Sequence, residues 1–261
     1  MSHQDETARL YDRSAASWAR SGPLLLSDFT ARPFVLEWCE PVRYSSVLDL
    51  GCGEGYVARQ LRRRGAVVRG IDVSEQMVAR AIEHERKDPL GIDFAVGDAT
   101  DLAEVDSDSI DLVVAVFLFN YLDRAGTTAA MAEVARVLRP GGRFVFTVPH
   151  PSLPFMRSEL PPFYFDRRGL GYFSARDATL EGRIWRRDGE VVPVRCVHKT
   201  LEDLFRCLAD AGLHSPVELR ELRVTHEHVA LDPEFFGPLE DTPLHLMFRL
   251  TLPSAGEGRA S

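Results

Sequence analysis

The stretch VLDLGCGEG, residues 47–55, places a strand-like run directly before three glycines, and an apolar-periodic segment follows. Glycine permits positive φ and close approach of a ligand, so the stretch predicts a tight strand-to-helix turn at a binding site. In the dinucleotide fingerprint G-x-G-x-x-G/A, counted from Gly51 and Gly53, a third small residue is required at position 56. Tyr56 occupies that position, and the third glycine, Gly55, comes one place earlier. Asp49, two residues before Gly51, would also repel a pyrophosphate. The turn therefore favours a ligand with a cationic group.

Strand and helix signals alternate on both sides of this turn. Alternation of this kind predicts an α/β fold, a mostly parallel sheet of seven strands with helices on both faces. The expected strands are 46–50, 67–71, 92–96, 110–116, 143–148, 217–224 and 244–252. The expected helices are about 55–65, 75–87, 127–138 and 200–211.

The domain organisation follows from length and from one change of pattern. With 261 residues, of which 45% are hydrophobic, the chain can build one sizeable core, so residues 1–261 are expected to form a single domain. Residues 149–199 are rich in proline, aromatic residues and arginine, and the pair Asp188-Gly189 predicts a hairpin within them. We expect this segment to be an insertion after the fifth strand that covers the substrate.

Composition excludes several classes of function. The net charge of −8 removes the basic footprint of a protein that binds nucleic acid through phosphates. The longest apolar run, residues 112–119, is too short to cross a bilayer. His226 and His228 have no third ligand at a set spacing, so no metal site is expected. Four cysteines without a C-x-x-C pair indicate a reducing cytoplasm.

Polar residues stand where the predicted strands end. Ligands of open α/β sheets bind beyond the carboxyl ends of the strands, so these residues are expected to converge on one crevice. Asp72 closes the second strand and could accept both hydroxyls of a ribose. Asp98 and Ala99 follow the third strand, where they could bind an adenine edge, and Met77 could pack on the purine ring. Asp72 alone would suit a nicotinamide cofactor equally well.

The motifs VLDLGCGEG, GIDVS, VGDAT, DLVVAVFLFNYL and LRPGGRFVFTVPHP, in this order, resemble those of class I S-adenosylmethionine-dependent methyltransferases of the small-molecule type. The resemblance covers roughly residues 46–150. It implies a Rossmann-like seven-stranded, mostly parallel sheet and S-adenosyl-L-methionine as cofactor. The N-terminal YDRSAASW resembles the family's lid helix, which implies an N-terminal lid or helical region over residues 1–40.

The resemblance also implies roles for individual residues. Asp49 would face the methionine ammonium, Asp72 would hold the ribose, and Asp98 and Ala99 would hold the adenine. The glycines would let the backbone pass close to the methionine moiety. The full cofactor-binding set that we expect is Tyr11, Trp18, Asp49, Gly51, Cys52, Gly53, Gly55, Asp72, Val73, Met77, Asp98, Ala99 and Phe117.

The acceptor side is less constrained, because methyl transfer from a sulfonium needs positioning more than a fixed catalytic group. His150, between two prolines after the fifth strand, is a candidate general base or a turn residue bonded to backbone. Tyr121 is the second catalytic candidate. The aromatic residues of 149–199 form either a pocket wall or a small satellite core. The candidate substrate-binding residues are Asn120, Phe163, Tyr164 and His198.

These observations predict methyl transfer from S-adenosylmethionine to the O, N or C atom of a small molecule, such as a metabolite or natural-product intermediate. No nucleic acid or membrane partner is expected, and a homodimer stays open. One alternative is a protein of the same fold that binds S-adenosylmethionine without transferring its methyl group. The other is a nicotinamide-dependent oxidoreductase, which Tyr56 and Asp49 disfavour.

Overall fold

The structure is a computed structural model that describes residues 3–18, 22–156, 159 and 161–254. The predicted lid region 1–40 and the predicted insertion 149–199 therefore each include a few residues outside the described part. Within that part, no helix combines the length and the apolar composition that a membrane span requires.

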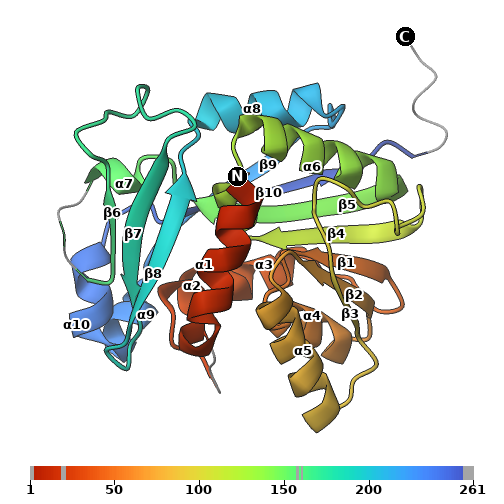
Figure 1. The fold of residues 1–261 in the computed structure, drawn as a ribbon, viewed down its shortest axis with the longest axis horizontal. Helices are drawn as coiled ribbons and strands as arrows, with labels where there is room; N and C mark the ends of the chain where they lie inside the picture. The colour runs from red at the N-terminus through yellow and green to blue at the C-terminus, as the bar shows by residue number, and fades with distance from the viewer. Residues whose placement is uncertain (1–2, 19–21, 157–158, 160, 255–261) are drawn as a thin grey trace.

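A seven-stranded sheet forms the centre of the molecule, in the order β3-β2-β1-β4-β5-β10-β9 (Figure 1). The first five strands run parallel, whereas β10 pairs antiparallel with both β5 and β9. The predicted α/β class with a mostly parallel seven-stranded sheet is confirmed. The strands are β1 (Ser46–Leu50), β2 (Val67–Asp72), β3 (Asp93–Val96), β4 (Ile110–Val116), β5 (Leu138–Pro149), β9 (Glu218–Leu222) and β10 (His245–Thr251).

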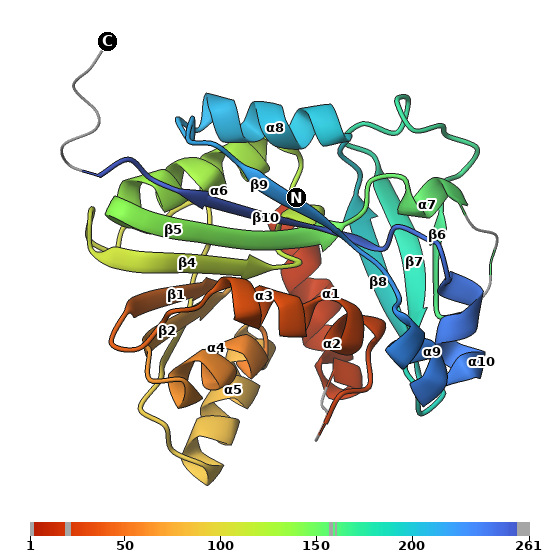
Figure 2. The same cartoon turned by 180° about the vertical axis from the view of Figure 1, so that it is seen from behind.

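Helices cover both faces of this sheet (Figures 1 and 2). Alternate residues of β1 point to opposite faces: Val47 joins the core beneath α3, α4 and α5, while Leu48 joins the core beneath α6 and α8. Apolar residues on both faces are typical of a parallel sheet that is buried on two sides. The helices are α3 (Arg32–Trp38), α4 (Tyr56–Arg63), α5 (Glu75–Lys87), α6 (Arg124–Val137) and α8 (Leu201–Asp210), with the one-turn helix η1 (Phe119–Tyr121) after β4.

A second, three-stranded antiparallel sheet lies beside the main one (Figure 1). It consists of β6 (Phe163–Asp166), β7 (Thr179–Trp185) and β8 (Val191–Val197), and β7 and β8 form the hairpin predicted at Asp188-Gly189. The short helix α7 (Leu153–Met156) packs on β6, and α9 (His226–Leu231) and α10 (Pro233–Phe236) stand at the same end of the molecule.

The N-terminal helix α1 (His3–Trp18) lies across the front of the molecule between the two sheets (Figure 1). It contacts α5, which belongs to the main domain, and β8, which belongs to the second sheet. The helix α2 (Leu26–Thr30) follows it and leads into α3. Because α1 touches both units, it closes the space between them.

Two parts of the chain differ from the predicted elements. The fifth strand begins at Leu138 rather than at residue 143, because the chain passes from α6 straight into extended backbone through Pro140, and the pairing with β4 shifts register between Ile110 and Leu112. The segment before β10, for which no element was predicted, forms α9, α10 and the turn η2 (Gly237–Leu239). Pro233 stands in the first turn of α10 after the capping Asp232, a start signal that the sequence carried.

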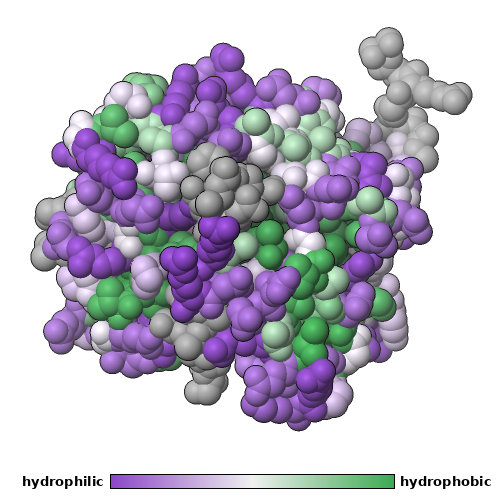
Figure 3. All heavy atoms as spheres, viewed as in Figure 1, coloured by the Kyte–Doolittle hydropathy of each residue, from purple (hydrophilic) through white to green (hydrophobic). Residues whose placement is uncertain are grey.

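The surface agrees with a chain that buries its apolar residues in these cores. The face seen in Figure 3 is mostly hydrophilic, and its hydrophobic residues form small separate patches.

Three glycines of the turn after β1 have positive φ, and Gly55 is the first residue outside α4, with φ of 85°. A Cβ atom there would lie 2.7 Å from Cζ of Phe94 on β3, so the close approach of α4 to the sheet requires a residue without a side chain.

We expect Gly55→Ala to destabilise the protein by about 2 to 4 kcal/mol, since it adds a steric conflict with a buried ring to the cost of left-handed backbone. Gly169→Ala is the matched control, because Gly169 has φ of 75° but a Cβ atom there would meet no described residue within 4 Å. That variant should lose only about 1 to 2 kcal/mol. Denaturant unfolding measures both. Equal losses would show that the contact with Phe94 is unimportant.

Candidate active site

A cavity of about 220 Å³ opens at the carboxyl ends of the parallel strands. Its floor is formed by residues at or just past the carboxyl ends of β1, β2, β3, β4 and β5, and its cover by α1, α2 and the second sheet. Most of the residues that the sequence predicts for cofactor or acceptor line it: Tyr11, Trp18, Asp49, Gly51, Cys52, Gly53, Asp72, Val73, Met77, Asp98, Ala99, Phe117, Asn120, Tyr121 and Phe163.

The glycine turn shapes one end of the cavity. Gly51 and Gly53 have φ of 69° and 55°, a conformation that residues with side chains rarely adopt. A Cβ atom on Gly53 would lie 3.3 Å from Cε of Met77, so glycine keeps this wall open. Gly55 differs from the prediction, because it is absent from the cavity lining and instead packs against Phe94.

Asp49 is the most deeply buried acid in the cavity wall, with 1% of its surface exposed. Its Oδ2 atom has no hydrogen-bond partner among the residues that the structure describes. Burial raises the pKa of this carboxyl to about 7, and the negative charge of Asp72 contributes in the same direction. A cation bound beside Asp49 would satisfy the orphaned oxygen and favour the ionised form.

Asp72, at the end of β2, is held by backbone donors. Its Oδ2 accepts from the N–H of Gly53 at 2.8 Å and its Oδ1 from the N–H of Ser74 at 2.9 Å. Each carboxylate oxygen can accept a second hydrogen bond, so the group is fixed in place and still able to bind hydroxyls. The Asp72 carboxylate thereby also connects the glycine turn to the start of α5.

The third acid, Asp98, follows β3 and is oriented by Thr100, whose backbone N–H and hydroxyl both donate to Oδ1 at 2.8 Å. Ala99 and Met77 are buried beside it in the cavity wall. Phe117, directly after β4, has a positive φ of 59°, which is unusual for a bulky residue and is tolerated where surrounding structure enforces it. A flat apolar group would fit between such walls.

Helix α1 closes the cavity through three contacts. The hydroxyl of Tyr11 donates to that of Tyr121, and the two rings also pack edge to face with their centroids 5.3 Å apart. Asp12 accepts a hydrogen bond of 2.6 Å from the hydroxyl of Ser74. Burial raises the pKa values of both tyrosines, so their hydroxyls stay neutral.

The second sheet supplies an apolar wall. Phe163 and Phe165 both line the cavity and are buried, whereas Tyr164, between them on β6, points to the other face and is absent from the lining. The prediction that Tyr164 binds substrate is therefore not supported by its position. Its neighbour Phe163 lies in the cavity lining, and its role toward a substrate stays a prediction.

His150 lies outside the cavity lining, in contrast to its predicted place beside the reacting methyl group. Its Nδ1 pairs with the hydroxyl of Ser152 at 2.7 Å and its Nε2 with the carboxylate of Glu221 at 3.1 Å. Burial lowers its pKa, an effect that Glu221 partly offsets. Both ring nitrogens are thus engaged in a turn beside β9, which is the structural alternative that the sequence left open.

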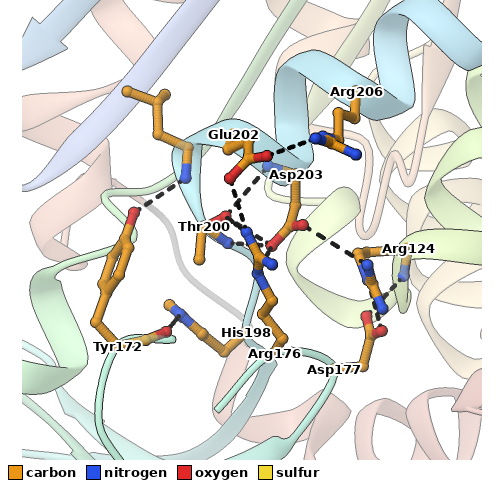
Figure 4. Close-up of polar contacts among 10 residues, drawn as sticks. Arg124, Tyr172, Arg176, Asp177, His198, Thr200, Glu202, Asp203 and Arg206 are labelled. Carbon is orange, nitrogen blue, oxygen red and sulfur yellow. Dashed lines mark hydrogen bonds and ion pairs between the residues drawn. The ribbon is translucent and has the colours of Figure 1, made fainter. Parts of the chain in front are cut away.

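His198 also lies away from the cavity. It belongs to a polar cluster at the start of α8, where its Nε2 pairs with the carbonyl oxygen of Tyr172 at 2.8 Å (Figure 4). In the same cluster Arg176 binds Glu202 at 2.9 Å and Asp203 at 3.1 Å. The cluster holds the loop after β6 against α8. His198 therefore anchors this loop, and its position does not support the prediction that it contacts substrate.

The cavity includes polar residues for which the sequence offered no motif. Arg32 forms an ion pair of 2.8 Å with Asp28, and its guanidinium lies 5.8 Å from the ring centroids of Tyr56 and Phe117. Arg195 on β8 donates to the hydroxyl of Thr7 on α1 at 2.5 Å. The third is His245, at the start of β10.

Comparison with known proteins finds a methyltransferase domain in part of the chain. Residues 47–142 match the family model described as a methyltransferase domain. A ubiquinone biosynthesis O-methyltransferase from Xanthomonas oryzae pv. oryzae is 29% identical over 149 residues, which are 56% of this chain. The match spans 62% of the length of that relative.

Solved structures extend the likeness beyond the matched segment. An S-adenosylmethionine-dependent methyltransferase from Mesorhizobium loti is 25% identical, with a TM-score of 0.62 over 84% of this chain and 96% of its own. The [4+2]-cyclase SpnF, 17% identical, shares the fold with a TM-score of 0.64 over 97% of both chains. With the glycine turn and the three acids at the strand ends, these findings identify residues 47–142 as a methyltransferase domain similar to those of S-adenosylmethionine-dependent methyltransferases.

Proposed function

We propose that this protein transfers the methyl group of S-adenosylmethionine to a small-molecule acceptor. The observation that carries the proposal is a cavity with an acidic end at Asp49, Asp72 and Asp98 and an apolar end beneath the second sheet. A cofactor with positive charge suits the first end, and an uncharged acceptor suits the second. The same space can therefore bring the two together.

The residues present fit the cofactor. The unpartnered Oδ2 of buried Asp49 suits the methionine ammonium, and the room that Gly53 leaves suits the passage of the methionine moiety. Asp72 would hold the ribose hydroxyls, and Asp98 with Ala99 would hold the adenine. S-adenosylmethionine would supply the electrophilic methyl group on its sulfonium. The chain's own contribution is to hold both partners and to exclude water by means of Trp18 and Tyr11.

The acceptor is proposed to lie against Phe163, Phe165 and Asn120, under the cover of β6–β8. Support comes from the apolar lining, from the enclosure by α1 and from the net charge of −8, which does not favour a nucleic acid. The curated relatives are named for O-methylation in ubiquinone biosynthesis, so an oxygen acceptor is the first to test.

The four cysteines are unpaired and buried, which supports a reducing cytoplasm as the proposed location.

The experiment that tests this function is the measurement of S-adenosylhomocysteine formed from S-adenosylmethionine with a panel of phenols, amines and carbon acids. Accumulation that depends on one class of acceptor is the expected result. Tight binding of the cofactor with no turnover on any acceptor would favour the non-methylating alternative. The fold is compatible with another named activity, since the [4+2]-cyclase SpnF shares it. Binding of NADH in preference to S-adenosylmethionine would favour an oxidoreductase.

The affinity for S-adenosylhomocysteine, which retains the methionine ammonium, is expected to rise with pH between about 5.5 and 7.5, as Asp49 loses its proton. Asp49→Asn should weaken binding by roughly 10- to 100-fold at pH 7.5, since a charge-assisted hydrogen bond is lost, and should remove the pH dependence. Isothermal titration calorimetry measures both. Unchanged affinity in a folded variant would remove Asp49 from the site.

The same carboxyl predicts a stability effect without any ligand. Aspartate in the unfolded chain has a pKa of about 3.9, whereas burial raises the pKa of Asp49 in the folded protein to about 7. The folded protein therefore binds more protons between these values, and its stability falls as pH rises through them. Asp49→Asn should raise the melting temperature by about 3 °C or more at pH 8, with a smaller gain near pH 5. A gain that does not depend on pH would contradict this assignment.

Another prediction uses the alternation of side chains along β6. Phe163→Leu should raise the KM for the acceptor or lower turnover by roughly 3- to 30-fold, because the cavity wall recedes, while affinity for S-adenosylhomocysteine changes less than about 2-fold. Tyr164→Leu is the control from the opposite face of the strand and should leave acceptor kinetics nearly unchanged. If cofactor affinity falls as much as acceptor turnover in the Phe163 variant, the second sheet has a structural role only.

A further inference from the structure

His245 stands at the edge of the sheet where the reaction is proposed to occur. It is the first residue of β10 and pairs in register with Pro149, the last residue of β5. Because β10 runs antiparallel to β5, its first residue lies beside the carboxyl ends of the parallel strands. The imidazole lines the cavity together with Pro149 and with Phe117, whose ring centroid is 5.0 Å away.

The hydrogen bonds of Thr30 define which nitrogen of His245 carries the proton. The Thr30 hydroxyl donates its single hydrogen to the carbonyl oxygen of Leu26 at 2.9 Å. The same hydroxyl oxygen lies 3.1 Å from Nε2 of His245, so it accepts there and Nε2 is the donor. The Nδ1 atom of the neutral ring is then left with a lone pair, and is an acceptor.

This acceptor is buried and has no partner among the residues that the structure describes. The side chain of His245 is 6% exposed, and its Nδ1 forms no hydrogen bond. Burial lowers the pKa of His245 to about 3, and the charges of Arg32 from α3 and His150 from the turn after β5 act in the same direction. The ring stays neutral, and a buried acceptor without a donor is an exception in folded proteins.

We propose that Nδ1 of His245 accepts a hydrogen bond from the methyl acceptor, which therefore carries an O–H or N–H donor on an apolar, ring-sized body. This assignment rests on the proposed function and deepens it, since it names the residue that selects the acceptor. An acceptor ring between Phe117 and the second-sheet wall would keep its donor group in reach of the imidazole. The hydrogen bond to Thr30 fixes the orientation of the imidazole itself. A molecule of the same shape without a donor would leave Nδ1 unpaired and would be disfavoured.

The test compares phenol with toluene, which differ in one donor group, on the full chain saturated with S-adenosylhomocysteine. His245→Gln keeps an amide near the position of Nε2, where it can bind Thr30, and removes the Nδ1 acceptor. His245→Asn does the reverse, since its amide oxygen can take the position of Nδ1. Dissociation constants for both probes are measured by ligand-observed NMR on the wild type and the two variants.

We expect the ratio of phenol to toluene affinity to fall by about 3- to 10-fold in His245→Gln and to remain within about 2-fold of wild type in His245→Asn. A purely structural histidine predicts the opposite order, because only the glutamine variant keeps the bond to Thr30. Three results would overturn the proposal. They are a larger fall of the ratio in His245→Asn than in His245→Gln, an unchanged ratio in both variants, and failure of the wild type to bind phenol at millimolar concentration. Absence of methyl transfer with the expected binding pattern would instead contradict the proposed function.

Discussion

The reversal of strand order between β1 and β4 is the constraint on which the site depends. From β1 the chain passes through α4 to β2 on one side, and β4 and β5 continue the sheet on the other, so the loops at the carboxyl ends diverge. Divergence opens a crevice directly above the centre of the sheet. Asp49 lies on β1 at this point, which explains how a carboxyl can be nearly inaccessible to solvent and still belong to a binding cavity.

The crevice becomes a closed cavity only because segments remote in sequence cover it. Helix α1 bonds α5 through Asp12, the turn after β4 through Tyr11, and the second sheet through Thr7. Each bond joins α1 to a different part of the wall. Displacement of α1 would therefore break contacts with several parts of the cavity wall together.

The residues that could be predicted from the sequence are those whose place is local. Asp49 lies near the end of the first strand signal, Asp72 closes the second and Asp98 follows the third, and the parallel topology brings such positions to one edge. His245 could not be found in this way, because the antiparallel register that sets it beside Pro149 is decided by pairing between strands far apart in the chain. The same register explains the error over His150, which is one residue past the strand end and turns toward Glu221. Tyr164 failed for a simpler reason, since a single residue along β6 exchanges the two faces of the strand.

The antiparallel course of β10 has a practical consequence. Its first residue, His245, reaches the cavity, but its last, Thr251, pairs with Arg143, which lies six residues before Pro149 on β5. Chain added after β10 therefore starts far from the cavity, whereas chain added before α1 starts beside a helix that lines it. Purification tags, fluorophores and surface-immobilisation handles belong at the C-terminal side, where the attachment leaves access to the cavity unchanged.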